Sequence, residues 1–385
     1  MKTLVQQIAP GINTMKRRDF LKKATVASSA VGISSLAVPA VAQARRELTI
    51  ITDGSPTGGQ ETSLFTGEPT ARLFHWIERA TNGEIIFRLY ESEDDIPEDA
   101  EFEIAMTGQA DGYYAGEYHW NAHHILYRLF GGSMPMGLSM EEFLGWFYHG
   151  EGEAMWNELG AQFNIKPFMS DTVGTQVTGW FTEEVRSLED LEGKNMHMPA
   201  VMGYIMERLG ANVGDYETSV IMAGLRDGSM YAVERSGPAN DIGAGFHEYA
   251  KYLYASVLHE PHSFSALGFN LETWNSFTAD QQRIIREISM AHHSYALAES
   301  TARNAAAMRT LQTEHGVRIM QFPEDVMIRM CELSGDFVRE MAATDDFSKR
   351  VIDSYVAYRD EALDWSEATT GKFVETRRLP FRYYP

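Results

Sequence analysis

Strand-like and helix-like segments alternate over residues 174–241, and this order limits the fold more than any other part of the chain does. Residues 196–199 are strand-like, and Val201, Ile205 and Leu209 then recur at every fourth position before a glycine. That spacing is typical of a helix with one apolar face and a glycine stop. Further helix-like and strand-like segments follow. The repeated strand–helix–strand order predicts an α/β fold.

Four polar residues fall at the ends of these predicted strands or just after them: Gln176, His197, Glu234 and Arg235. In open α/β sheets, ligands bind at the carboxyl ends of strands. We therefore expect these four side chains to lie at a ligand site.

The chain is long enough for more than one hydrophobic core. It has 385 residues, whereas single cores stop growing near about 250–300 residues. Its 44% of hydrophobic and 23% of charged residues are ordinary for a globular protein. The length therefore predicts two lobes or domains.

The charge of the chain argues against binding to nucleic acid. The formal net charge is −21, and the first 44 residues carry +5, which leaves −26 on the remainder. A surface with that balance repels phosphate backbones and anionic lipid.

The N-terminus resembles a twin-arginine export signal over residues 1–44. Arg17 and Arg18 precede Phe20-Leu21-Lys22 and a mild apolar run that ends in Pro39 and small residues. The alternative is a membrane anchor, but the run contains Thr, Ser and Gly and is too short to span a bilayer. We expect the mature protein to be exported to the periplasm.

Other segments add elements to the fold. Residues 48–52 and 85–89 are strand-like with a helix between them, and residues 141–159 have the pattern of one helix. Thr278 and Gln281 form the capping-box pattern at the start of a long helix.

An apolar stripe runs along the last predicted helix. It consists of Phe347, Val351, Tyr355, Tyr358, Ala362 and Trp365. Such a stripe needs a surface to bury against. The spacing allows two partners, the helix's own lobe or a second copy of the chain.

Several motifs together with the export signal resemble the solute-binding subunits of tripartite ATP-independent periplasmic (TRAP) transporters, in particular the branch that binds 2-oxo acids. The resemblance extends from about Leu48 to Phe373. The motifs are Gly174-x-Gln176-x-x-Gly179-Trp180-Phe181, Asp190-Leu191-x-Gly193, Gly210-Ala211, Glu234-x-x-Gly237-Pro238-x-x-Asp241 and Trp365-Ser-Glu367.

The resemblance implies a two-lobed periplasmic binding protein-like α/β fold with hinge strands and a long C-terminal helix. It implies one lobe from residues 45–170 with 262–312 and another from residues 171–261 with 313–345. Residues 346–385 would form a C-terminal dimerisation helix and tail, so a homodimer is expected.

The resemblance also implies roles for individual residues. An aromatic residue at the mouth of the cleft falls at Tyr118, and Gln176 contacts the ligand and a cation. Glu234 and Glu260 are the other implied cation ligands. A bound Na⁺ or Ca²⁺ bridging protein and solute would use these three hard oxygen donors.

Two positions depart from the family pattern. The family's carboxylate-binding arginine is His197 here, and the tryptophan after the family's glutamate is Arg235. A histidine cannot reproduce the two-pronged guanidinium contact. Either Arg235 supplies the positive charge, or the solute is not a simple carboxylate.

The sequence therefore predicts an extracytoplasmic receptor that binds a small organic acid, a 2-oxo acid or a related monocarboxylate, and delivers it to a TRAP permease without catalysis. One alternative is a secreted metal-assisted hydrolase that uses Glu234, Glu260 and nearby histidines. Another is a ligand sensor for a membrane histidine kinase. The sequence lacks the Gly-x-Ser-x-Gly, phosphate-loop and metalloprotease motifs that would favour an enzyme.

Overall fold

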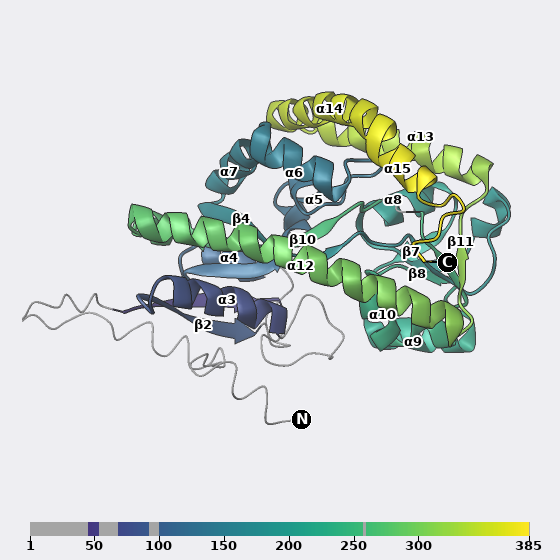
Figure 1. Cartoon of the computed structure of the whole chain (residues 1–385), viewed down its shortest axis with the longest axis horizontal. Coiled ribbons are helices and arrows are strands. Elements are labelled where there is room, and N and C mark those ends of the chain that lie inside the picture. Colours follow the sequence, from purple (N-terminus) through teal and green to yellow (C-terminus); the bar gives the residue numbers. More distant parts are fainter. Residues whose placement is uncertain (1–44, 54–67, 92–99, 257–258, 385) are drawn as a thin grey trace, which may run out of the picture.

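The computed structural model describes residues 45–53, 68–91, 100–256 and 259–384. Within these residues the chain forms two β-sheets flanked by helices, one sheet in each of two lobes (Figure 1). The predicted two-lobed α/β fold is confirmed. The predicted export signal, residues 1–44, lies outside the described residues.

The first sheet has the strand order β2-β1-β3-β10-β4. Strand β1 pairs in parallel with β2 and β3, whereas β10 runs antiparallel to both of its neighbours. All five residues of β3 and all eight of β10 are buried, because helices cover both faces of the sheet. The strands are β1 (Arg46–Thr52), β2 (Ile85–Glu91), β3 (Gly112–Gly116), β4 (Ile165–Gly174) and β10 (Ser263–Asn270).

The second sheet has the order β11-β9-β5-β8-β6-β7. Strand β6 lies in parallel between β7 and β8, so these three carboxyl ends meet at one edge of the sheet. The strands are β5 (Gly179–Phe181), β6 (Asn195–His197), β7 (Asn212–Gly214), β8 (Ala232–Val233), β9 (Tyr252–Tyr254) and β11 (Arg318–Met320).

Helices surround both sheets (Figure 1). They are α3 (Glu68–Ala80), α4 (Ala100–Met106), α5 (Leu126–Phe130), α6 (Met140–His149), α7 (Gly152–Gln162), α8 (Ala200–Arg208), α9 (Thr218–Asp227), α10 (Pro238–Ala244), α11 (Leu271–Asn275), α12 (Ala279–Thr313), α13 (Glu324–Ala342), α14 (Asp346–Ser366) and α15 (Lys372–Thr376). Short 3₁₀-helices occupy Glu117–Ala122, Leu188–Leu191 and Phe246–Glu248, and a π-helical turn covers Glu367–Gly371.

Helix α12 is 35 residues long and runs along both lobes, beside α3 and β4 in one and α10 in the other (Figure 1). It begins at the predicted capping box, in which the Gln281 N–H donates to Thr278 Oγ1 at 3.2 Å. Ile285 is buried in the core beside the first sheet, and Leu311 in the core beside the second. One helix thus contributes to the packing of both lobes.

The helix predicted over residues 141–159 is in fact two helices, α6 and α7, so that prediction is wrong. The break lies at Gly150, whose backbone (φ −98°, ψ −141°) is not helical. Trp146 and Trp156 still share one core cluster, because the second helix turns back onto the first. An apolar pattern can thus continue across a glycine at which the helix ends.

No helix in the described ranges combines the length and apolar character that crossing a bilayer needs.

Candidate functional site

Two crossovers between the lobes lie side by side and bring two predicted site residues together. One crossover joins β4 to β5 and contains Gln176; the other joins β9 to β10 and contains Glu260. The Gln176 N–H donates to the Glu260 carbonyl oxygen at 3.4 Å, and Gln176 Nε2 donates to Glu260 Oε2 at 2.5 Å. Ser133 donates its hydroxyl hydrogen to Glu260 Oε1 at 2.5 Å. These bonds fix the carboxylate at the centre of the connection between the lobes.

Glu234 and His197 reach the same region from the carboxyl edge of the second sheet. His197 ends β6, and Glu234 follows β8, which runs parallel to β6. The Glu234 N–H donates to the His197 carbonyl oxygen at 2.8 Å. Only 1% of Glu234 is exposed, and its Oε1 lies 3.6 Å from Nε2 of the buried His259.

Burial dominates the acid–base behaviour of this cluster. It raises the pKa of Glu234 to about 8 and also raises the pKa of Glu260, while it lowers the pKa of His259. Around neutral pH the Glu234 carboxyl therefore favours its protonated form and His259 stays uncharged. A cation placed beside these side chains would favour the ionised carboxylates.

Several oxygen atoms of the cluster are buried without a hydrogen-bond partner: Gln176 Oε1, Thr178 Oγ1 and Glu234 Oε1. Buried polar atoms are normally paired, so orphaned oxygens indicate a missing partner. Oxygen donors suit hard cations such as Na⁺ and Ca²⁺. No three His, Cys, Asp or Glu side chains of the described residues meet at a potential metal site, so amide or hydroxyl oxygens would have to complete any such cation site.

His197 and Arg235 line a neighbouring cavity of about 460 Å³. His197 Nδ1 accepts the Tyr216 N–H at 3.1 Å, and burial lowers the pKa of the ring. The ring is therefore neutral, with its hydrogen on Nε2. Arg235 is exposed and donates to Thr218 Oγ1 at 2.6 Å.

Tyr118 approaches the cluster from the first lobe, on the 3₁₀-helix Glu117–Ala122. Burial raises the pKa of its hydroxyl far above the ordinary value, and the carboxylates of Asp53, Glu260 and Glu234 raise it further, whereas Arg235 lowers it. These interactions place Tyr118 near Glu260 of the second crossover and near Glu234 and Arg235 of the second sheet. The neighbouring aromatics Tyr113, Tyr114 and Trp120 are instead buried in hydrophobic cores.

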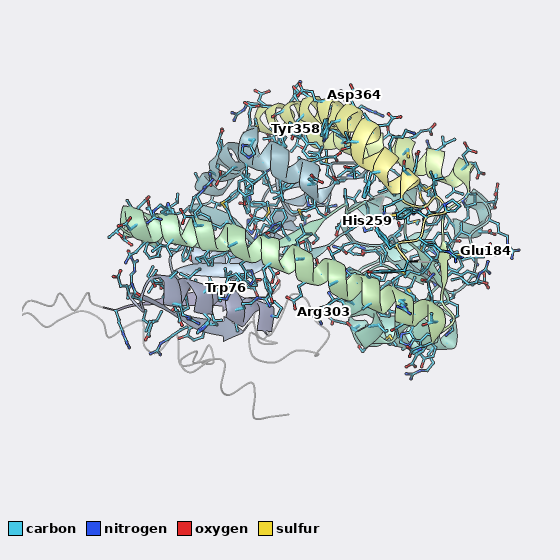
Figure 2. The ribbon with its side chains drawn as sticks, in the orientation of Figure 1. Trp76, Glu184, His259, Arg303, Tyr358 and Asp364 are labelled. Atoms are coloured by element: carbon cyan, nitrogen blue, oxygen red, sulfur yellow. The ribbon has the colours of Figure 1, made fainter. Side chains whose placement is uncertain are left out.

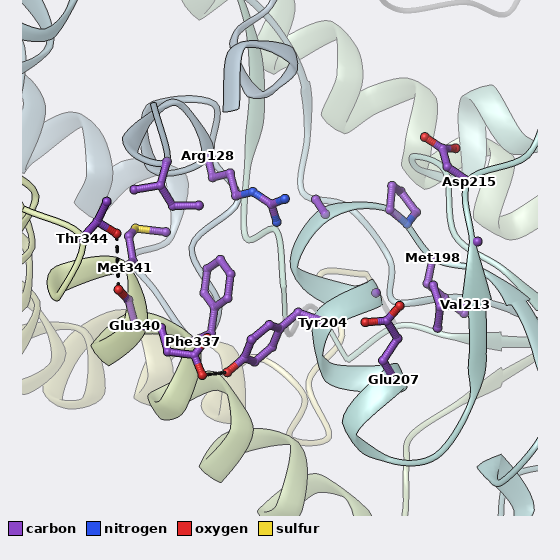
Figure 3. A pocket seen from close by; sticks show the side chains of 15 residues that line it. Arg128, Met198, Tyr204, Glu207, Val213, Asp215, Phe337, Glu340, Met341 and Thr344 are labelled. Carbon is purple, nitrogen blue, oxygen red and sulfur yellow. Dashed lines mark hydrogen bonds between the residues drawn. The ribbon is translucent and has the colours of Figure 1, made fainter. Parts of the chain in front are cut away.

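A second cavity, of about 510 Å³, separates α5 of the first lobe from the ends of β6 and β7 and from α13 (Figure 3). Asp215 lines both this cavity and the one beside His197. The Arg128 guanidinium extends into it from α5 (Figure 3).

Sequence reasoning missed Arg128, Ser133 and His259. His259 lies in the interior of the molecule, whereas Glu184 and Asp364 lie at its periphery (Figure 2). Arg128 had a detectable signal, because it is the one charged residue in the apolar run 125–130. Ser133 and His259 had none, since their places depend on contacts distant in sequence.

Two α/β lobes joined by paired crossovers, with a buried polar cluster where they meet, define a two-lobed solute-binding protein. Residues 63–345 match the family model described as bacterial extracellular solute-binding protein, family 7 (DctP), and the chain belongs to this family.

Individual relatives agree with this assignment. A monocarboxylate 2-oxoacid-binding periplasmic protein of Nostoc is 25% identical over 354 residues, which cover 91% of this chain and 96% of the relative. A TRAP periplasmic solute-binding protein of Pseudoalteromonas atlantica, solved with sodium and pyruvate, is 24% identical with a TM-score of 0.78, covering 86% of this chain and 99% of that one. A TRAP solute-binding protein of Bordetella bronchiseptica, a mixed-occupancy dimer with calcium and picolinate, is 20% identical with a TM-score of 0.78, covering 87% and 97%.

Proposed function

We propose that this solute-binding protein receives a small organic acid, a 2-oxo acid or a related monocarboxylate, in the cleft between its lobes and delivers it to a TRAP permease. The main support for this proposal is the cluster of Gln176, Glu234 and Glu260. In it, buried oxygen atoms from two crossovers and one strand end lie in the same region. The Nostoc relative is named for binding monocarboxylate 2-oxo acids, and the Pseudoalteromonas relative holds pyruvate.

A cation, Na⁺ or Ca²⁺, completes this site in our proposal. Gln176, Glu234 and Glu260 would hold it, and when bound it would bridge the protein to the oxygens of the acid. The unpaired Gln176 Oε1 and Glu234 Oε1 support this arrangement. Relatives with bound sodium or calcium support it independently.

Tyr118, His197 and Arg235 contact the solute in the same proposal. Tyr118 reaches the cluster from the first lobe, and the neutral His197 can donate through its Nε2–H. Arg235 lines the same cavity as His197 and adds a positive charge there.

The lobes comprise residues 45–170 with 262–312 and residues 171–261 with 313–345, and the hinge lies at the crossovers between them. Residues 1–44 direct twin-arginine export to the periplasm. The end of α14, α15 and the tail mediate a homodimer. Exposed apolar side chains there support the dimer, namely Trp365, Phe373, Val374, Leu379, Phe381, Tyr383 and Tyr384.

A thermal-shift screen of the exported chain tests the ligand class, with panels of 2-oxo acids, hydroxy acids, amino acids and ectoine-like solutes, each with Na⁺, Ca²⁺ or a chelator. A ligand at 100 times its Kd stabilises the folded state by about 2.7 kcal/mol, which raises the Tm of a chain of this length by roughly 4 °C. We expect 2-oxo acids to raise the Tm by that amount, and by more when the cation is present. We expect NMR to detect no product from the bound acid.

Turnover of a bound compound would favour the hydrolase. If none of the acids raised the Tm, the proposed ligand class would be refuted. A ligand sensor would bind the same acid as a transport receptor. Affinity capture of partners from solubilised membranes distinguishes these two functions. Recovery of a histidine kinase in place of permease subunits would favour the sensor.

A further inference from the structure

Arg128 is held rigidly at the edge of the lobe interface. It lies on α5, whose other residues, Leu126, Tyr127, Leu129 and Phe130, are each 0% exposed. Because these four side chains anchor the short helix in the core, the backbone of Arg128 has little freedom. Its side chain leaves the core and enters the 510 Å³ cavity (Figure 3).

The guanidinium of Arg128 is poorly satisfied. Its Nη2 donates to Asn121 Oδ1 at 3.2 Å, and its Cζ lies 5.8 Å from the centre of the Phe337 ring. Its Nε is buried and has no hydrogen-bond partner. Among the described residues, no carboxylate lies within ion-pair distance of it. A partly buried cation in this state costs free energy unless something else pairs with it.

The carboxylate that interacts electrostatically with Arg128, that of Glu260, already has other hydrogen-bond partners. Arg128 and Glu260 act on each other electrostatically, the arginine lowering the pKa of Glu260 and the glutamate raising that of Arg128. Both oxygens of Glu260, however, accept hydrogen bonds from Ser133 and Gln176. Arg128 therefore lies close to the proposed cation site without being neutralised by it.

The cavity that Arg128 lines adjoins the cavity of His197 and Arg235. Met198 and Pro199 follow β6, and Gly214 and Asp215 end or follow β7. Asp215 also borders the cavity of His197 and Arg235. Two further carboxylates line the Arg128 cavity, Glu207 and Glu340. Glu340 is exposed and accepts from the Tyr204 hydroxyl at 2.7 Å, so it does not pair with Arg128.

Three side chains compete for the role of carboxylate partner. His197 is neutral and its Nδ1 is occupied by the Tyr216 N–H. Arg235 is exposed, so water screens its charge. Arg128 is half-buried and always charged, and among the described residues its guanidinium fork makes one hydrogen bond, from Nη2 to Asn121 Oδ1, which leaves the fork that suits a carboxylate incompletely paired.

We propose that Arg128 is the residue that pairs with the solute's carboxylate, so that the anchor expected at position 197 in the second lobe is supplied here from α5 in the first. This inference rests on the proposed function. It makes Arg128 a specificity-determining residue for an acid over its uncharged analogue.

The test compares an acid with its amide. The probes are the 2-oxo acid that gives the largest shift in the screen and the corresponding primary amide, measured by calorimetry on the exported full chain with the preferred cation. Loss of one charge-assisted interaction weakens binding by about 10- to 100-fold. We expect Arg128→Gln to weaken the acid by that factor and to leave the amide unchanged, so that the acid-to-amide ratio falls.

The acid-to-amide affinity ratio of Arg128→Lys should lie between those of the wild type and Arg128→Gln, because lysine keeps the charge but not the planar guanidinium fork. Arg226→Gln on α9, an exposed arginine outside both cavities, is the matched control and should leave both affinities unchanged. If Arg128→Gln does not fold, the Arg128→Lys ratio decides the question, and an unchanged ratio overturns the inference.

The inference is also overturned if Arg128→Gln weakens acid and amide equally, which marks a structural role, or if it changes neither. A fall of the ratio in Arg235→Gln alone would transfer the role to Arg235 and leave the proposed function intact. Failure of every 2-oxo acid to bind the wild type would instead refute the proposed ligand class together with this inference.

Discussion

At the scale of single residues, Glu234 shows how strongly the fold alters one side chain. Only 1% of the residue is exposed, and its Oε1 has no hydrogen-bond partner. A histidine nitrogen, Nε2 of the neutral His259, lies 3.6 Å from that oxygen. Burial raises its pKa from the ordinary 4.5 to about 8. The sequence marked Glu234 as polar and at a strand end, but its ionisation depends on how completely the second lobe covers it.

Glu234 should therefore make the ligand-free protein less stable as the pH rises. Because its folded pKa is raised, its contribution is fully present below about pH 4.5 and is lost as the pH approaches 8. Without added cation, Glu234→Gln should gain stability over the wild type between pH 5 and 9, by on the order of a few kcal/mol. Urea unfolding across that pH range measures the difference.

Glu314→Gln, which changes an exposed carboxylate at the end of α12, is the control. Its curve of unfolding free energy against pH should run parallel to that of the wild type. Parallel curves for Glu234→Gln and wild type would contradict the raised pKa.

At the scale of elements, one side chain of α12, that of Asn304, hydrogen-bonds to segments on both sides of the first crossover. Asn304 Oδ1 accepts the Ala239 N–H at 2.9 Å, and its Nδ2 donates to the Val173 carbonyl oxygen at 3.1 Å. Val173 lies at the end of β4, just before the first crossover, and Ala239 lies in the first turn of α10. Asn304 thus joins the start of a hinge segment to the second lobe.

Replacing Asn304 by Ala should lower the free energy of unfolding by about 1–3 kcal/mol, because it leaves a buried N–H and a buried carbonyl unpaired. Urea denaturation of the ligand-free protein measures the loss. Thr301→Ala, one turn earlier on the exposed side of the same helix, should change it by less than about 0.5 kcal/mol. Equal effects at both positions would show that Asn304 has no special role.

At the scale of the whole molecule, the C-terminal helix divides its apolar stripe between two environments. Val351 and Tyr355 are buried in the same core cluster as α13, so the first half of α14 packs on its own chain. Trp365 is 69% exposed and Phe373 61% exposed. The end of α14 and helix α15, which carries Phe373, therefore offer the surface that the proposed homodimer needs.

The double substitution Trp365→Asp and Phe373→Asp should convert a dimer into a monomer, because it places charges in the apolar contact. Light scattering after size-exclusion chromatography measures the mass. Ile328→Asp changes another exposed apolar residue, 55% exposed on α13, and should leave the dimer intact. A monomeric wild type would refute the homodimer.

Local patterns determined much of the element order. The four-residue spacing of Val201, Ile205 and Leu209 predicted α8, and Thr278 with Gln281 marked the start of α12. Both signals act over one or two turns, so they survive without tertiary context. The three-residue strand β7 escaped prediction, because so short an edge strand forms only by pairing with β6.

The sequence by itself determined the α/β alternation, the two-lobed size and the polar residues at strand ends, since each depends on neighbours along the chain. Only the tertiary structure decided that two crossovers place Gln176 against Glu260, that His259 faces Glu234, and that Arg128 enters the cleft between the lobes. These residues are far apart in sequence, and their burial, which sets their charge and their missing partners, exists only when both lobes are folded together.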